Sequence, residues 1–297
     1  MPADARVFAL VALCAISPLA KAQATAQRAT TDEPVLRARA LRAGAPVKMF
    51  VPSGAVRLIG WDRDSIVIRG RLPASAQLIF GGSDSTGYKL VVEQRDGESM
   101  AASRLLIYLP RRSQISIKTA DASVNATDVG GWFYTVSGRY HIDGTMSSVD
   151  VETMSGDIEL DVATPWARAK TGKGHLVVHG SPQDVDASTI GGILDIAAAT
   201  IMRGRFTSVT GDIHYASTMA PHSLFEFSSH SGAVDLLLPH DVSARFELST
   251  VYGEIDNGFT QLRPAAAGVH NLQLSFGSGA ADVTVRTFKG TVRLRSR

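Results

Sequence analysis

Apolar residues in the second half of the chain form short alternating runs on either side of a glycine. In the stretch VDVETMSGDIEL, Val149 and Val151 precede Gly156, and Ile158 and Leu160 follow it. Alternation with a period of two is typical of a β-strand with one buried face. The buried positions change from odd to even numbers across the glycine, which predicts a corner there. Glycine suits a corner because it tolerates positive φ.

This unit recurs along most of the chain and defines a column of corner residues. The corner glycines are Gly138, Gly156, Gly174, Gly192, Gly211, Gly232, Gly253 and Gly290, and Ala122 fills the same position one unit earlier. Periods of this kind indicate stacked structural repeats. A small hydroxyl residue stands three positions before each corner, at Thr119, Thr135, Thr153, Thr171, Thr189, Ser208, Ser229, Thr250 and Thr287. We interpret these hydroxyls as structural groups that hydrogen-bond at the corners.

Two all-β architectures fit the repeat: a parallel β-solenoid with coils of about 18–21 residues, or an antiparallel meander of hairpins. The outward column six positions before the glycine reads Asp150, Arg168, Asp186, Arg205, Glu226 and Glu247. Its signs alternate at most steps, and opposite charges stabilise strands that lie side by side. Ser-Gly and Thr-Gly are also poor sequences for type I′ hairpin turns. The pattern therefore favours the solenoid.

Residues 1–22 have the features of a secretory signal peptide. Arg6 precedes an apolar run over residues 7–16, and Ala20-Lys21-Ala22 forms a cleavage site before Gln23. A membrane-spanning helix needs about 20 apolar residues, so this run is too short to be an anchor. We expect an exported protein, either periplasmic or on the cell surface, that does not span the membrane.

The rest of the chain divides by composition into three segments. Residues 23–46 are rich in Ala, Arg and Thr, which predicts a flexible tether. Residues 47–112 hold strand-like runs interrupted by polar loops, and we expect an irregular N-terminal β cap. Residues 113–297 carry the regular repeats. A cap is expected because each coil buries its apolar face only against its neighbours.

The charge and cysteine content of the chain exclude some classes of function. After residue 22 the chain has 28 basic and 27 acidic residues, which is not the charge footprint of a nucleic-acid-binding protein. The single cysteine, Cys14, lies within the signal, so the mature chain has neither a disulfide nor a reactive thiol. Acylation of Cys14 is the alternative, but the bulky Leu13 before it disfavours this.

Two surface features are candidate binding sites. Trp132 and Tyr134 occupy outward positions where other units carry charged or small polar residues. An exposed aromatic pair on a rigid β face could stack on a sugar or a protein partner, unless a loop from the N-terminal region covers it. The second feature is the outward column Asp195, His214, Asp235 and Asp256. If the coils stack, this ladder could hold a divalent cation, and the alternative is a solvated charged face without a ligand.

No catalytic motif places Ser, His and Asp together, and no phosphate-binding loop is present. The loops after Gly138 are short, which disfavours a deep cleft. We therefore expect neither enzymatic activity nor a cofactor.

The combination of an export signal, the segment GAVRLIGWDRDSIVIRG, the junction LLIYLPRRSQISIKTADASV and serial SGDIEL-type units is specific. It resembles a bacterial β-strand-repeat family known as "putative adhesin" and classified as a domain of unknown function. The resemblance covers about residues 47–297 and implies an extracytoplasmic β-solenoid. It implies a non-catalytic envelope module that presents a rigid surface to a protein or glycan. A self-associating envelope scaffold and a β-helical polysaccharide enzyme are the alternatives.

Overall fold

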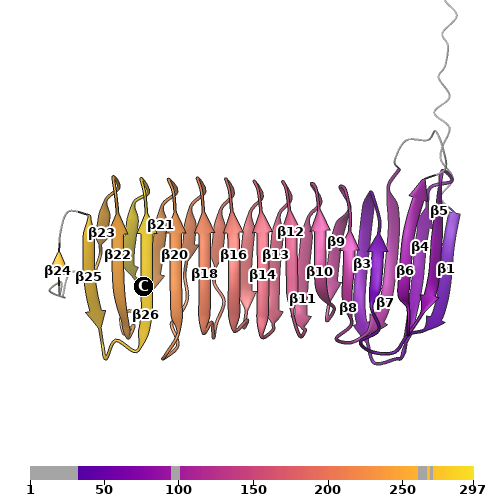
Figure 1. The fold of residues 1–297 in the computed structure, drawn as a ribbon, viewed down its shortest axis with the longest axis horizontal. Helices are drawn as coiled ribbons and strands as arrows, with labels where there is room; N and C mark the ends of the chain where they lie inside the picture. The colour runs from indigo at the N-terminus through magenta and orange to yellow at the C-terminus, as the bar shows by residue number, and fades with distance from the viewer. Residues whose placement is uncertain (1–32, 95–100, 260–265, 268–269) are drawn as a thin grey trace, which may run out of the picture. The chain divides into compact units, whose positions relative to one another are not determined.

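Two large sheets face each other across a core of apolar side chains. The computed structural model describes residues 33–94, 101–259, 266–267 and 270–297. Residues 31–297 form one unit, and residues 1–30, which include the predicted signal, lie outside the described residues. The described residues form strands, turns and loops, and the fold is all-β (Figure 1).

Among the described residues, sheet A has 13 strands and sheet B has 14. In spatial order, sheet A contains β1 (Glu33–Ala40), β4 (Ser65–Leu72), β7 (Ser103–Pro110), β3 (Gly54–Trp61), β9 (Ser123–Thr127), β11 (Tyr140–Thr145), β13 (Ile158–Ala163), β15 (Leu176–Gly180), β17 (Leu194–Ile196), β19 (Ile213–Tyr215), β21 (Val234–Leu238), β27 (Val292–Ser296) and β23 (Ile255–Asn257). Sheet B contains β24 (Ala266–Ala267), β25 (Asn271–Phe276), β22 (Ala244–Thr250), β26 (Ala281–Thr287), β20 (Leu224–Ser229), β18 (Arg203–Ser208), β16 (Asp184–Thr189), β14 (Trp166–Thr171), β12 (Val149–Thr153), β10 (Gly130–Thr135), β8 (Gln114–Lys118), β2 (Val47–Phe50), β6 (Gly87–Gln94) and β5 (Ala76–Ser83).

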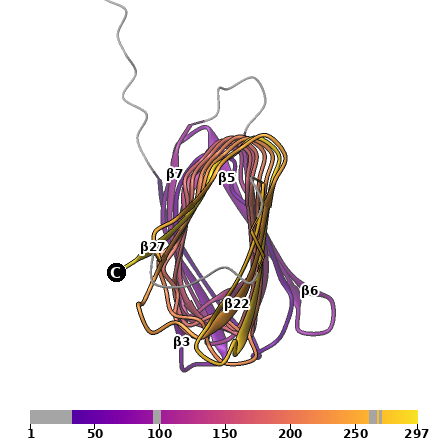
Figure 2. The same cartoon turned by 90° about the vertical axis from the view of Figure 1, so that its left-hand side faces the viewer.

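The regular coils stack in parallel, which confirms the solenoid and excludes the meander. Each coil contributes one strand to each sheet, and neighbouring coils pair in register, as Val149↔Ala167 shows in sheet B and Ile158↔Leu176 in sheet A. Viewed end on, the coils of this unit superimpose (Figure 2). The predicted charge column is formed as far as Glu226, because Asp150, Arg168, Asp186, Arg205 and Glu226 are successive neighbours.

The alternating pattern places apolar side chains between the sheets. Ile158 and Leu160 are buried, whereas Glu159 is exposed. A cluster of aromatic rings fills the core further along, where Phe206 lies 5.1 Å from Phe227 and 6.2 Å from Tyr215, measured between ring centroids. Gly204 makes room for them, since a Cβ there would lie 2.7 Å from Phe206. Burial raises the pKa of the Tyr215 hydroxyl, which donates to the Thr218 carbonyl at 2.8 Å.

The corner glycines are required by close approach between coils, which corrects the expectation of positive φ. None of the eight corner glycines has positive φ. A Cβ added to Gly156 would lie 1.8 Å from the carbonyl oxygen of Gly138, and one added to Gly192 would lie 1.8 Å from that of Gly174. Real Cβ atoms do not approach so closely, so each coil corner can stack on the last only without a side chain.

The Thr and Ser side chains three positions before the corners are buried, and several of them hydrogen-bond to the corner backbone. Thr135, Thr153 and Thr189 each accept a hydrogen bond from the amide of their own corner glycine, at 2.8–3.0 Å. Thr171 also donates to the carbonyl of Gly156 in the preceding coil at 3.0 Å. The threonines therefore fix the corner and in places link it to the next coil, because they satisfy backbone groups that the turn leaves unpaired.

The order of the last coils differs from their order in the sequence. Strands β26 and β27 insert between the coil of β20–β21 and the coil of β22–β23. Glu226 and Glu247 were expected to be neighbours, but both lie beside Thr284. The insertion also separates Asp235 from Asp256, because Arg293 lies between them. Both expected adjacencies are therefore wrong.

Antiparallel strands flank the stack at its N-terminal end. β1 pairs with β4 and β4 with β7 in sheet A, and β5 pairs with β6 in sheet B. Residues 23–46 were predicted to be a flexible tether, but Glu33–Ala40 form β1 and Leu41 is fully buried. The described part of that segment is therefore structured, and residues 23–32 lie outside the described residues.

Candidate ligand-binding face

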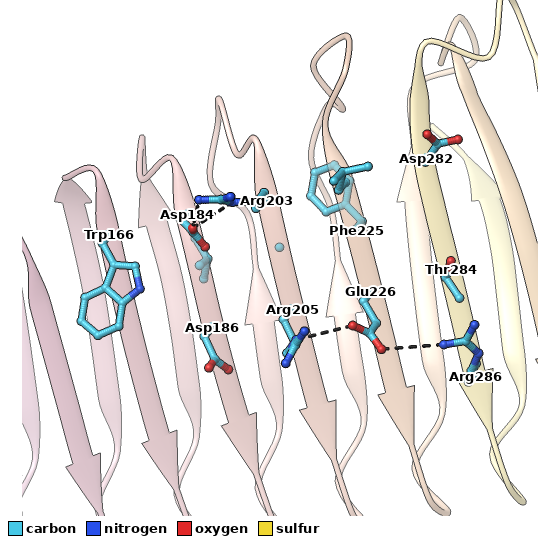
Figure 3. A pocket seen from close by; sticks show the side chains of 13 residues that line it. Trp166, Asp184, Asp186, Arg203, Arg205, Phe225, Glu226, Asp282, Thr284 and Arg286 are labelled. Carbon is cyan, nitrogen blue, oxygen red and sulfur yellow. Dashed lines mark hydrogen bonds and ion pairs between the residues drawn. The ribbon is translucent and has the colours of Figure 1, made fainter.

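The outer face of sheet B carries a shallow hollow of about 560 Å³. Successive strands build it from two rows of outward side chains. The first row is Trp166, Asp184, Arg203, Leu224 and Asp282, and the second is Asp186, Arg205, Glu226 and Thr284. Figure 3 shows the rows crossing the strands β14, β16, β18, β20 and β26.

Ion pairs between neighbouring strands hold the polar side chains of the hollow in place. Arg203 contacts Asp184 at 2.7 Å, and Glu226 lies between Arg205 at 3.4 Å and Arg286 at 3.8 Å (Figure 3). These groups are partly exposed, so each pair contributes little to stability. Their main consequence is geometric, because they hold carboxylate and guanidinium groups at fixed positions on a rigid sheet.

Trp166 provides an aromatic ring at one end of the hollow. Its side chain is 37% exposed and lies next to Asp184 on the neighbouring strand. The repeat pattern did not single out Trp166, although Trp166 lies eight positions before Gly174 and therefore shares the outward parity of Arg168. Trp166 could have been identified by following the outward positions two residues further toward the start of the strand.

The predicted aromatic pair lies on the same face. Trp132 and Tyr134 stack with ring centroids 5.8 Å apart at 17°, and the Lys118 amine lies 5.1 Å from the Trp132 ring centroid. Both aromatic side chains are half-buried. Asp150 and Arg168 follow Trp132 across the sheet and lead to Asp186 in the hollow. The pair and the hollow are thus two parts of one continuous surface.

This surface offers the contacts that a polyhydroxylated ligand requires. Aromatic rings stack on apolar faces of a ligand, while carboxylates accept and guanidiniums donate hydrogen bonds to hydroxyls. Desolvation raises the pKa of the Asp150 carboxyl, with the nearby Arg168 opposing it. The carboxylates of Asp184 and Glu226 are paired with arginines, an arrangement suited to accepting hydrogen bonds.

The acidic and histidine ladder lies on the opposite sheet and is only partly formed. His214 contacts Asp195 at 2.9 Å and Asp235 at 3.7 Å. Arg293 contacts Asp235 at 3.1 Å and lies between Asp235 and Asp256. Its positively charged guanidinium group therefore takes the position next to Asp235 where the sequence pattern placed the carboxylate of Asp256. Within the described residues, no group of three or more His, Cys, Asp or Glu side chains is arranged to hold a metal ion.

The comparisons with known proteins agree with the fold. The model of the Toastrack DUF4097 family matches residues 82–295. A solved structure described as a "putative adhesin" from Parabacteroides distasonis is 9% identical and has a TM-score of 0.53, covering 89% of this chain and 98% of its own. A "putative adhesin" from Parabacteroides merdae is 10% identical with a TM-score of 0.51, covering 88% and 96%.

A third structure, described as a "putative lipid binding protein" from Parabacteroides distasonis, is 9% identical with a TM-score of 0.53 and covers 88% of this chain and 96% of its own. At these identities the likeness concerns the fold alone. A comparison with curated proteins found no significant match. The described residues include no helix with the length and hydropathy that a membrane crossing needs. Because the family model spans most of the chain, the protein belongs to the Toastrack DUF4097 family.

Proposed function

We propose that the protein is a non-catalytic, adhesin-like module of the cell envelope that binds a glycan on the outer face of sheet B. The observation that carries this proposal is the hollow, in which Trp166 lies beside fixed carboxylate and guanidinium groups. Trp132 and Tyr134 extend the same face. An extended surface with rings at intervals suits a chain of sugars better than a small compact ligand.

The rigidity of the sheet supports a binding role. Parallel strands of neighbouring coils fix the rows of side chains, so little conformational entropy is lost when a ligand binds. The ion pairs with arginines hold the carboxylates of Asp184 and Glu226 in place as hydrogen-bond acceptors. Export by the predicted signal peptide would place the module where it meets envelope or host glycans.

The test is binding of the purified protein to an array of bacterial and host oligosaccharides. Trp166→Ala and Trp132→Ala should each weaken binding of the best-bound glycan by about thirtyfold, since a central aromatic contributes about 2 kcal/mol. Tyr252→Ala is the control, because Tyr252 is 70% exposed but lies at a coil corner outside the face. All three variants should melt near the temperature of the unmodified protein.

Two results would contradict the proposal. One is an unmodified protein that retains no glycan on the array. The other is a glycan whose binding is unchanged by both tryptophan substitutions. Loss of binding together with a lowered melting temperature would also count against it, because it would show that the rings stabilise the fold instead.

A further inference from the structure

Four arginines gather on the outer face of sheet A at the N-terminal end of the stack. Arg57, Arg69, Arg71 and Arg104 are all exposed and come from the adjacent strands β3, β4 and β7. They surround a shallow hollow of about 380 Å³ whose lining also includes Leu106. This arginine cluster is separate from the proposed glycan-binding face, which lies on the other sheet.

The register places like charges side by side. Arg71 lies directly opposite Arg104, and Leu106 lies between Arg69 and Arg57. Like charges at opposed positions of a sheet are destabilising. Among the described residues, no ion pair involves Arg57, Arg69 or Arg71.

Several arginines elsewhere on the stack form ion pairs. Arg168, Arg203 and Arg245 each contact a carboxylate on a neighbouring strand. Ion pairing is therefore common among the arginines of the stack, whereas Arg57, Arg69 and Arg71 depart from it. The surrounding sequence is also basic, because residues 33–94 hold nine Lys and Arg against five Asp and Glu. The cluster thus has the charge of a site for a multivalent anion.

The arginine side chain indicates the kind of anion. A guanidinium group donates two parallel hydrogen bonds to one phosphate, and several such groups together favour phosphate strongly. Apolar groups lie beside the charges: Leu36, opposite Arg69, is 63% exposed, and Leu106 forms part of the lining. A ligand with a phosphate group and an adjacent apolar part matches both features.

We propose that the arginine cluster binds the phosphate groups of anionic phospholipids and holds this end of the protein against a membrane surface. The basic cluster and exposed Leu36 would enter the headgroup layer. Further along the same sheet face, carboxylates such as Glu159 and Asp195 would be repelled by an anionic surface. The charge distribution therefore orients the protein with its N-terminal end toward the lipid.

The experiment is sedimentation of the purified protein with vesicles of phosphatidylcholine alone or mixed with phosphatidylglycerol. Binding to the mixed vesicles and not to the neutral ones is expected, with the affinity falling as salt is raised. Arg69→Gln with Arg71→Gln should weaken it about thirtyfold, at about 1 kcal/mol for each basic residue near the surface. Arg245→Gln with Arg295→Gln removes the same charge elsewhere and should change the affinity much less.

A thermal melt and a second probe complete the test. Arg69→Gln with Arg71→Gln should melt no lower than the unmodified protein at low salt, because it relieves repulsion. Equal losses in the two double variants would overturn the proposal, as would the absence of vesicle binding. Calorimetry with inorganic phosphate separates the sources: phosphate binding that needs Arg69 and Arg71, without vesicle binding, would overturn the lipid assignment and leave a soluble phosphate as the ligand.

Discussion

At the scale of single residues, the corner glycines set the distance between coils. A Cβ on Gly192 would lie 1.8 Å from the Gly174 carbonyl oxygen, so Gly192→Ala must push two coils apart. We expect a loss of about 1–3 kcal/mol or more, as for overpacking of a core, and a melting temperature lower by several degrees.

The adjacent glycine provides a matched control for this change. A Cβ on Gly191 would meet only Thr210 Oγ1 at 3.3 Å and the Gly172 oxygen at 4.0 Å. Gly191→Ala should therefore leave the melting temperature within about a degree of the unmodified protein. Equal melting temperatures for the two variants would show that close stacking is not what requires glycine at the corner.

At the scale of elements, the insertion of β26 and β27 determines which charges meet. Arg293 lies between Asp235 and Asp256 on the outer face of sheet A. Arg293→Glu would place three acidic side chains in a row, and we expect it to destabilise the protein by about 1–2 kcal/mol at low salt. Melting curves at low and high salt test this, since salt screens repulsion between partly exposed charges.

Arg295→Glu is the control on the same strand. Arg295 shares the outward face of β27, but its partner on β21 is Leu237, and Gly258 lies beside it on the other side; neither residue carries a charge. Its substitution should lower the melting temperature less. If the two variants melt alike at low salt, Arg293 is not flanked by the two aspartates and the coil order is wrong.

The sequence was sufficient to predict the repeating element but not its ends. Alternation around Gly156 identified the buried positions, because burial of one strand face leaves a period of two. It could not reveal the insertion of β26, because Gly253 and Gly290 carry the same corner pattern whichever coil they stack on. The composition of residues 33–40 suggested a tether, yet pairing with β4 makes them a strand. Partners distant in the sequence decide such cases.

The repeat pattern identified only some residues of the candidate site. Trp132 stood out because it departs from a column of charges, and the structure places it on an outward face beside Tyr134. Trp166 was missed because the outward column was followed only from six positions before each corner, and Trp166 lies eight positions before Gly174. The ladder of Asp195 and His214 was predicted from parity, but the intervening Arg293 follows only from the three-dimensional coil order.

At the scale of the whole molecule, the ends of a β-solenoid determine whether copies join. An uncovered edge strand invites pairing with another chain, and proteins oppose this with proline, charge and short strands. In sheet A the outermost N-terminal strand, β1, carries Pro34, Arg37 and Arg39. The Arg39 guanidinium lies 5.9 Å from the centroid of the Phe80 ring, so a charge stands over the apolar end of the core.

We therefore expect a monomer whose mass by light scattering does not change with concentration. At the opposite end the outer strand of sheet A, β23, has only three residues, which offers little backbone to a partner. Replacing Pro34, Arg37 and Arg39 together with valine should produce oligomers, whereas Arg205→Val with Arg245→Val, on inner strands, should not. Oligomers that grow with concentration in the unmodified protein would instead favour the self-associating scaffold, because they would show that proline and arginine do not protect this edge.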